Sequence, residues 1–295
     1  MAALSPAGAA PCCPGPDPQP HGPQSFTVPV GAVDCHAHVI GLPPDYPLVE
    51  GRSYTPPEAT PAAYLQMLDG SGMSYGVLVQ VSVHGFDNRR MLQALAAAPD
   101  RLRGIAVMPL GLSDSAYVAA KNSGVVGLRL NVLFGGGVGF DTLEDYAALA
   151  REMGWHLQFL LDARALPGLA ARIARLPVPF VVDHMGHVPT AEVSPDDAAF
   201  QTLVALVRDG GWVKLSGAYR LSANEPPYVD TVAYAQRLLE AAPDRCLWGS
   251  DWPHVALWRT MPNVGSLLDT LALWAPDDDL RRKILVTNPA RLYGL

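Results

Sequence analysis

Short runs of apolar residues alternate along the chain with longer stretches in which apolar residues recur every three or four positions. The short runs have the length of strands buried on both faces, and the longer stretches have the spacing of amphipathic helices. Eight strand-like runs occur, at residues 32–38, 76–82, 104–108, 126–131, 156–162, 178–184, 212–216 and 246–251. Helices are expected between them, at 61–71, 88–98, 143–153, 167–176, 196–209 and 231–242.

Eight strands that alternate with helices indicate an α/β protein, a single (β/α)8 barrel of the TIM type, in residues 28–295. An open doubly wound sheet more often has about five to seven strands and a phosphate-binding loop after the first. No such glycine motif follows the first run, and we interpret Gly135–Gly137 after the fourth run as a flexible loop. Residues 1–27 are rich in proline and glycine and are predicted to form a disordered tail.

Composition narrows the class of protein. The 295 residues are 49% hydrophobic and 17% charged, whereas soluble domains average about 25% charged residues, so a large core is expected. A net charge of −7 argues against nucleic-acid binding, which needs a basic surface. The apolar runs are shorter than the roughly 18 residues that span a bilayer. The four cysteines lack the spacing of a disulfide framework or a zinc site, and no secretory signal is present, so a cytoplasmic location is expected. The sequence leaves the oligomeric state open.

Polar residues gather at the carboxyl ends of the predicted strands, where the catalytic groups of such barrels lie. Side chains two apart in a strand point to the same side, so His36 and His38 are expected to point into the barrel mouth. By the same alternation, Cys35 and Ala37 should face the helices. The ends of the first, sixth and eighth runs are expected to bring together His36, His38, His184 and Asp251.

Other polar residues near these ends have structural interpretations. Asp34 is expected to brace the loop after the first run. The remaining histidines are assigned to packing or to the surface, and they are His21, His84, His156, His187 and His254.

Four segments carry a family resemblance: VDCHAH, VVDHMGH, LWGSDWPH and KILVTNPARLYG. Together they resemble the amidohydrolase superfamily, and within it the lactonase branch typified by 2-pyrone-4,6-dicarboxylate hydrolase. The resemblance implies a hydrolase of aromatic-compound catabolism that opens the ring of a small anionic lactone, such as a carboxylated pyrone or a muconolactone. It implies that Asp251 is the general base and that His36, His38 and His184 surround the scissile carbonyl. The substrate contacts that it implies are Tyr54, Ser82, Arg129 and Arg220.

Two departures from the branch put the 2-pyrone dicarboxylate itself in question. Gly135 stands where the pyrone hydrolase has a second arginine, and Leu160 stands where it has a tyrosine. Fewer groups remain to hold a second carboxylate. A lactone with one carboxylate, or a sugar lactone, is therefore an alternative substrate.

Whether a metal is needed is the main mechanistic question left by the sequence. Metal-dependent members of the superfamily add a strand-four lysine or acid and a strand-five histidine, whereas this chain has Arg129 and Leu161 there. We therefore expect no essential metal. A single zinc ion, held by His36, His38, His184 and Asp251, is the alternative.

Two further functions remain open at this stage. A zinc-dependent decarboxylase of the same superfamily would use the same histidines and aspartate. A catalytically silent ligand-binding barrel is the other, and a buried salt bridge on Asp251 without an open pocket would favour it.

Overall fold

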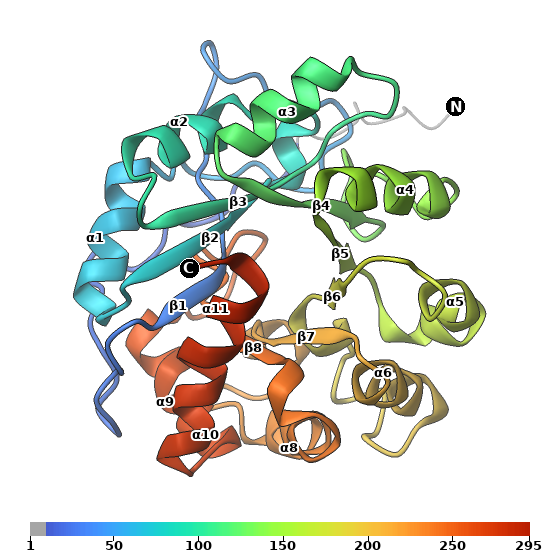
Figure 1. Cartoon of the computed structure of the whole chain (residues 1–295). Coiled ribbons are helices and arrows are strands. Elements are labelled where there is room, and N and C mark those ends of the chain that lie inside the picture. Colours follow the sequence, from blue (N-terminus) through green and yellow to red (C-terminus); the bar gives the residue numbers. More distant parts are fainter. Residues whose placement is uncertain (1–9) are drawn as a thin grey trace, which may run out of the picture.

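Eight parallel strands follow one another in chain order around a barrel (Figure 1). The computed structural model describes residues 10–295. The strands are β1 (Val33–Ala37), β2 (Tyr75–Val79), β3 (Leu102–Ala106), β4 (Val125–Asn131), β5 (His156–Leu160), β6 (Phe180–Val182), β7 (Trp212–Leu215) and β8 (Cys246–Trp248). Each overlaps an expected run, so the predicted TIM barrel is confirmed.

Helices surround the barrel on its outside (Figure 1). They are α1 (Pro61–Ser71), α2 (Arg89–Ala97), α3 (Asp114–Asn122), α4 (Leu143–Met153), α5 (Leu166–Ile173), α6 (Ala198–Arg208), α7 (Ala218–Leu221), α8 (Val232–Ala241), α9 (Val264–Trp274), α10 (Asp278–Arg282) and α11 (Asn288–Tyr293). Five of these helices were not expected from the sequence, namely α3, α7, α9, α10 and α11. In α9 the reason is clear, because seven of its residues are buried and no polar face marks it as a helix.

Helix α1 shows why several boundaries were predicted correctly. The Thr60 side chain accepts a hydrogen bond from the backbone N–H of Ala63 at 3.0 Å, and Pro61 occupies the first helical position. Gly72 ends the helix in the left-handed conformation, with φ of 81°. These local signals are readable in the sequence, and the helix has the bounds expected from it.

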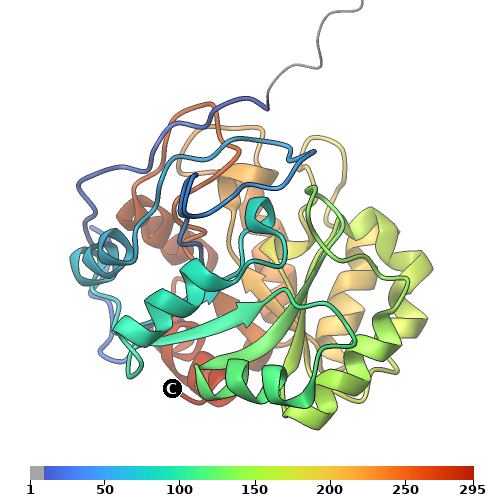
Figure 2. The same ribbon diagram turned by 90° about the horizontal axis from the view of Figure 1, so that it is seen from above.

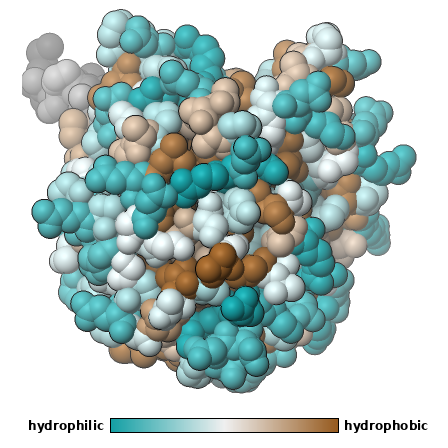
Figure 3. Space-filling view, turned by 60° about the vertical axis from the view of Figure 1, so that its left-hand side comes forward, coloured by the Kyte–Doolittle hydropathy of each residue, from teal (hydrophilic) through white to brown (hydrophobic). Residues whose placement is uncertain are grey.

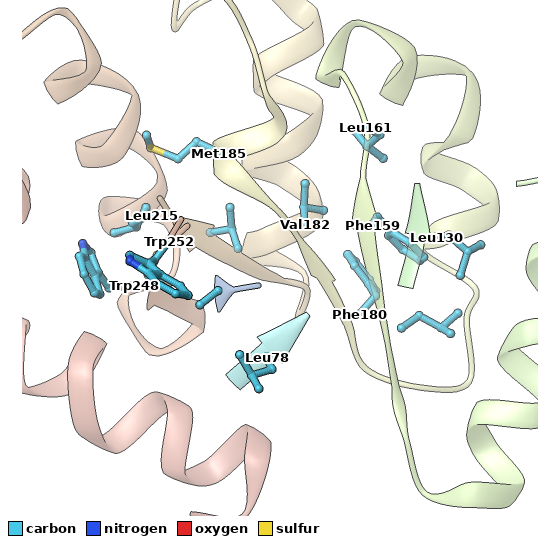
Figure 4. Packing of buried hydrophobic residues seen from close by; sticks show 14 of the residues in the cluster. Leu78, Leu130, Phe159, Leu161, Phe180, Val182, Met185, Leu215, Trp248 and Trp252 are labelled. Atoms are coloured by element: carbon cyan, nitrogen blue, oxygen red, sulfur yellow. The ribbon is translucent and has the colours of Figure 1, made fainter. Parts of the chain in front are cut away.

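The core has two parts, one between strands and helices and one inside the barrel. Figure 4 shows part of the outer one, where the rings of Phe159 and Phe180 stack with centroids 5.9 Å apart. The inner one, called here the interior cluster, consists of Val33, Cys35, Val77, Val79, Ile105, Val181, Trp212, Leu247 and Tyr293. It fills the barrel below the carboxyl ends of the strands, so the polar residues above it have a rigid floor.

Cys35 belongs to this interior cluster, which corrects the expectation that it faces the helices. The pairing between β1 and β2 shifts between Asp34 and Ala37: Asp34 pairs with Gly76, and Ala37 pairs with Leu78. Three steps along β1 therefore match two steps along β2, as in a β-bulge. The extra residue breaks strict alternation.

Residues 10–27 pack along the barrel rather than forming a free tail. The backbone N–H groups of Gln24 and Ser25 donate to the carboxylate of Asp269 on α9 at 2.9 and 2.8 Å, and that of His21 donates to Asn263 at 3.3 Å. In this part the structure differs from the expected disorder, because side chains of α9 and its N-terminal cap satisfy backbone groups that composition alone leaves exposed. Residues 1–9 lie outside the described residues, and the division at residue 28 stays a prediction.

The surface mixes hydrophilic and hydrophobic residues, as Figure 3 shows for one face. Large exposed hydrophobic side chains include Phe86, Val132, Val229 and Trp258. Among residues 10–295, no helix combines the length and the apolar character needed to cross a membrane.

Candidate active site

The barrel closes where β1 meets the segment that follows β8. The backbone N–H of Asp251 donates to the carbonyl of His36 at 2.7 Å, and that of His38 donates to the carbonyl of Trp252 at 2.8 Å. These two bonds fix Asp251 beside the pair of histidines on β1. Asp34 supports the junction, since its carboxylate accepts from the Ser250 N–H at 2.7 Å and from the Ser250 hydroxyl at 2.6 Å. Asp34 thus braces the structure as expected.

The structure brings the four expected residues into one group. Asp251 Oδ1 lies 3.8 Å from His36 Nε2 and 3.7 Å from His38 Nε2, and Asp251 Oδ2 lies 3.8 Å from His184 Nε2. The ring centroid of His36 lies 5.0 Å from that of His38 and 4.5 Å from that of His184. All four side chains are buried. Convergence at one rim, which alternation and strand order predict, is therefore present.

The two oxygens of Asp251 have different surroundings. Oδ2 accepts from the Tyr219 hydroxyl at 2.6 Å and from Arg220 Nε at 2.5 Å. Oδ1 is buried and has no hydrogen-bond partner among the described residues. Burial by itself would raise the pKa of Asp251, but the charge of Arg220, together with the hydrogen bond that Arg220 donates, holds it well below its usual range. Asp251 is therefore an anion with one oxygen available.

The hydrogen bonds at Nδ1 assign the free nitrogen of His38 and leave that of His184 open. His38 Nδ1 lies 2.7 Å from the carbonyl of Val79 and must donate to it, so a neutral His38 presents a lone pair at Nε2. His184 Nδ1 lies 2.8 Å from the Ser216 hydroxyl, which can donate or accept. Burial lowers the pKa of His36, and it lowers those of His38 and His184 well below the usual value, so all three rings are neutral at neutral pH.

Beneath His36 lies a buried polar network that the sequence analysis missed. His36 Nδ1 is 3.2 Å from Asp183 Oδ1 and also 3.2 Å from Lys214 Nζ, so its proton can sit on either ring nitrogen. Lys214 donates to Gln158 at 2.7 Å and lies 3.4 Å from Asp183. The signal was present in the sequence, since Lys214 is a single charge within an apolar strand.

Arg129 faces the same group from β4. Its Nη1 donates to the carbonyl of Gln80 at 3.0 Å, whereas its buried Nε has no partner among the described residues. Tyr54 is also buried, which raises the pKa of its phenol, and the charges of Arg220 and Arg129 both act on it. A buried guanidinium donor without a partner is suited to an anionic ligand.

Ser82, another expected substrate contact, has a partner within the protein, and so does His254. The Ser82 hydroxyl accepts from Asn131 Nδ2 at 2.8 Å. His254, expected to serve packing or the surface, has Nδ1 3.3 Å from the hydroxyl of Tyr219, the phenol that donates to Asp251. His254 and Tyr219 therefore belong to the hydrogen-bonded group around Asp251, and the contact of His254 is visible only in the tertiary structure.

The departure at Gly135 has a steric basis. A Cβ at Gly135 would lie 2.6 Å from the carbonyl oxygen of Gly51. An arginine there would require the backbone to move. The loop thus differs from an arginine-bearing one in shape as well as in charge.

The donor set fits a single divalent cation. One ligand atom from each of His36, His184 and Asp251 lies within 4.8 Å of the others. His36 Nε2 and Asp251 Oδ1 are both buried without a partner, as cation ligands would be. Metal-binding histidines commonly donate their other ring N–H to a carboxylate or a carbonyl, as His36 can to Asp183 and as His38 does to Val79.

The site is closed to solvent in this conformation. Asp251 is fully buried in its pair with Arg220, and Tyr54 and His184 are only 1% and 2% exposed. A buried salt bridge on Asp251 is one feature that we expected of a silent ligand-binding barrel. A substrate can reach Asp251 only after the loops that cover the site open.

Comparison with known proteins decides the family. The family described as Amidohydrolase matches residues 33–295. The chain belongs to the amidohydrolase family. A 4-sulfomuconolactone hydrolase of Rhizobium radiobacter is 40% identical over 97% of each chain. A 2-pyrone-4,6-dicarboxylate hydrolase of Comamonas testosteroni is 37% identical over 93% of each. A solved structure of an Agrobacterium tumefaciens protein superposes with a TM-score of 0.86 at 26% identity, and the match covers 95% of this chain and 99% of that one.

Proposed function

We propose that this amidohydrolase opens the ring of a lactone that carries an anionic substituent. The observation that carries the proposal is the unpartnered Oδ1 of Asp251 between His36 and His38, with the buried Arg129 and the partly buried Arg220 near it. The relatives named above hydrolyse a sulfomuconolactone and a pyrone dicarboxylate, by their names, and both names describe rings with acidic substituents.

Asp251 Oδ1 and His38 Nε2 are both acceptors, 3.7 Å apart. A water molecule between them would donate one proton to each, which turns its oxygen lone pair toward the substrate. Asp251 then accepts the proton as the water oxygen attacks the lactone carbonyl. Positioning the water in this way replaces a bimolecular encounter by a fixed geometry.

The other two histidines supply donors to the carbonyl oxygen. His36 and His184 each have an Nδ1 partner that permits a proton on Nε2, namely Lys214 and the Ser216 hydroxyl. Two Nε2–H groups would stabilise the negative charge that develops on the carbonyl oxygen. This refines the expectation that all three histidines polarise it, because the proton of His38 is committed to Val79.

Collapse of the tetrahedral intermediate breaks the bond between the carbonyl carbon and the ring oxygen. Asp251 returns its proton to that departing oxygen. The product is an open-chain carboxylic acid with a hydroxyl or enol group, and the enzyme recovers its starting protonation state.

Arg220 and Arg129 bind the anionic substituent in this proposal. Arg220 is paired with Asp251 in the structure, so an anionic substrate would compete for the same guanidinium. Arg129 offers a buried Nε–H that has no partner in the described protein. Short-range binding of this kind is needed because the net charge of −7 repels anions at a distance.

A divalent cation fits the same atoms. His36, His184 and Asp251 would hold it, and when bound it would polarise the lactone carbonyl as a Lewis acid. In the part of the chain that the structure describes, His36 Nε2 and Asp251 Oδ1 can each accept a hydrogen bond but have no donor. They favour a metal-dependent mechanism more than the residues on strands four and five did. Chelator-treated protein that keeps its full kcat would support metal-free catalysis, and lost turnover restored by zinc would overturn it.

The proposal is tested with a panel of carboxylated pyrones, muconolactones and aldonolactones, with metal analysis of the same sample. Ring opening without CO2 release, fastest for anionic lactones, is the expected result. CO2 release would replace the lactonase by a decarboxylase. Preference for neutral aldonolactones would indicate a sugar-lactone hydrolase, and binding without turnover would indicate a silent barrel.

A further inference from the structure

The closed site has a roof that includes the N-terminal segment. Figure 2 shows this segment, in blue, close to the orange-red loop that follows β8, above the carboxyl ends of the strands. Because Asp251 and Tyr54 are almost fully buried, substrate can reach them only after part of this roof moves.

Residues 10–13, called here the strap, join two loops of the roof. On one side, the N–H of Cys13 donates to the carbonyl of Thr55 at 2.9 Å, and the N–H of Thr55 donates to the carbonyl of Pro11 at 2.8 Å. The Thr55 hydroxyl adds a bond to the carbonyl of Ala10 at 3.0 Å. These three bonds hold Thr55, the residue after Tyr54, in a short parallel bridge with Cys12.

On its other side the strap contacts the loop after β8. Trp258 Nε1 donates to the carbonyl of Cys12 at 2.8 Å, and the N–H of Ala256 donates to Cys13 Sγ at 3.2 Å. The residue before Ala256 is Val255, whose carbonyl accepts from Arg220 Nη2 at 3.1 Å. The strap is therefore one residue from Tyr54 on one loop and one residue from an Arg220 partner on the other.

We propose that the strap is a positioning element for substrate binding, which holds Tyr54 and the loop after β8 in register over the site and opens to admit the substrate. The inference rests on the proposed function for its kinetic test. It concerns residues that precede the matched family region, which begins at residue 33. Within the described residues, no hydrogen bond or ion pair joins the strap to Asp251 or to the three histidines, so it acts on binding rather than on the chemical step.

Deletion of residues 2–13 tests this, with deletion of residues 2–9 as the matched control that keeps the strap. For the preferred lactone we expect KM to rise by about tenfold or more and kcat to change by less than about threefold, because Asp251 and its histidines stay in place. The control should match the full chain. Unchanged KM, or an equal loss of kcat in both deletions, would overturn the proposal.

If the longer deletion fails to fold, Trp258→Phe removes one strap bond from an exposed side chain and should raise KM by about two- to fivefold. A KM equal to that of the full chain would count against the strap.

Hydrogen exchange gives a readout that needs no substrate. In the chain without residues 2–13, amides at 49–59 and 252–258 should exchange faster, whereas those of β4 and β5 should not. If the amides of both loops exchanged at the same rates as in the full chain, the strap proposal would be overturned. Faster exchange in a protein that hydrolyses no lactone would refute the proposed function and leave the strap standing.

Discussion

Replacing Asp251 by asparagine isolates the proposed base. The amide oxygen can take the place of Oδ2 and keep the bonds from Tyr219 and Arg220, and the amide nitrogen takes the place of Oδ1. Shape is preserved, but no atom there can accept a proton from water. We therefore expect kcat to fall by at least about 10²-fold, the lower end of the usual contribution of a general base, which corresponds to about 2.7 kcal/mol.

The same substitution leaves Arg220 buried without its anion. Removing one partner of a buried pair costs about 3–5 kcal/mol, which is a large share of the about 5–15 kcal/mol that holds a domain folded. Urea unfolding should show this loss. Substrate affinity should change only a few fold, since an anionic substrate gains an unpaired arginine and loses a repelling carboxylate.

Tyr219→Phe is the matched control, because it removes one donor to Oδ2 and leaves Oδ1 untouched. Its kcat should fall by less than about tenfold. Metal analysis of both variants separates loss of the base from loss of a cation. A decrease below tenfold in the asparagine variant, at equal metal content, would refute the general-base assignment.

Arg129→Met should raise KM at least about tenfold for a carboxylated lactone and much less for a neutral one; equal changes would mean that Arg129 serves the fold. Because burial lowers the pKa values of His36, His38 and His184, these rings are protonated only in acid, and a plot of kcat/KM against pH should show no inflection near 6.5. Isothermal titration with zinc should show about one site per chain, and no binding would refute the cation fit. Lys214→Met should lower the free energy of unfolding by about 3–5 kcal/mol in urea, and a loss below about 1 kcal/mol would contradict a buried pair with Asp183.

Local sequence signals determined the strands and helices of the barrel on which the candidate site is built. Thr60, Pro61 and Gly72 mark the ends of α1 through their own backbone preferences, and the boundaries agreed with the structure. The position of His36 and His38 at the end of β1, and of Asp251 after β8, followed from the order of the strands, since all strands of such a barrel end at one rim.

Tertiary contacts decided what each group at that rim can do. The bulge in β1 placed Cys35 inside the barrel, because pairing with β2, rather than alternation within β1, sets its direction. Lys214 and Tyr219 acquired their roles from partners distant in sequence, Asp183 and Asp251. No periodicity reports such pairs.

The N-terminal segment shows the same division. Its proline-rich composition indicates that it forms no regular element, and residues 10–27 contain no helix or strand. Where it lies depends on acceptors supplied by other parts of the chain, such as the carbonyl of Thr55 and the carboxylate of Asp269. Sequence thus indicated which polar residues meet at one rim, and the fold decided which oxygen of Asp251 is free, which nitrogen of His38 holds the proton and what covers the site, because each of these depends on neighbours brought together only by folding.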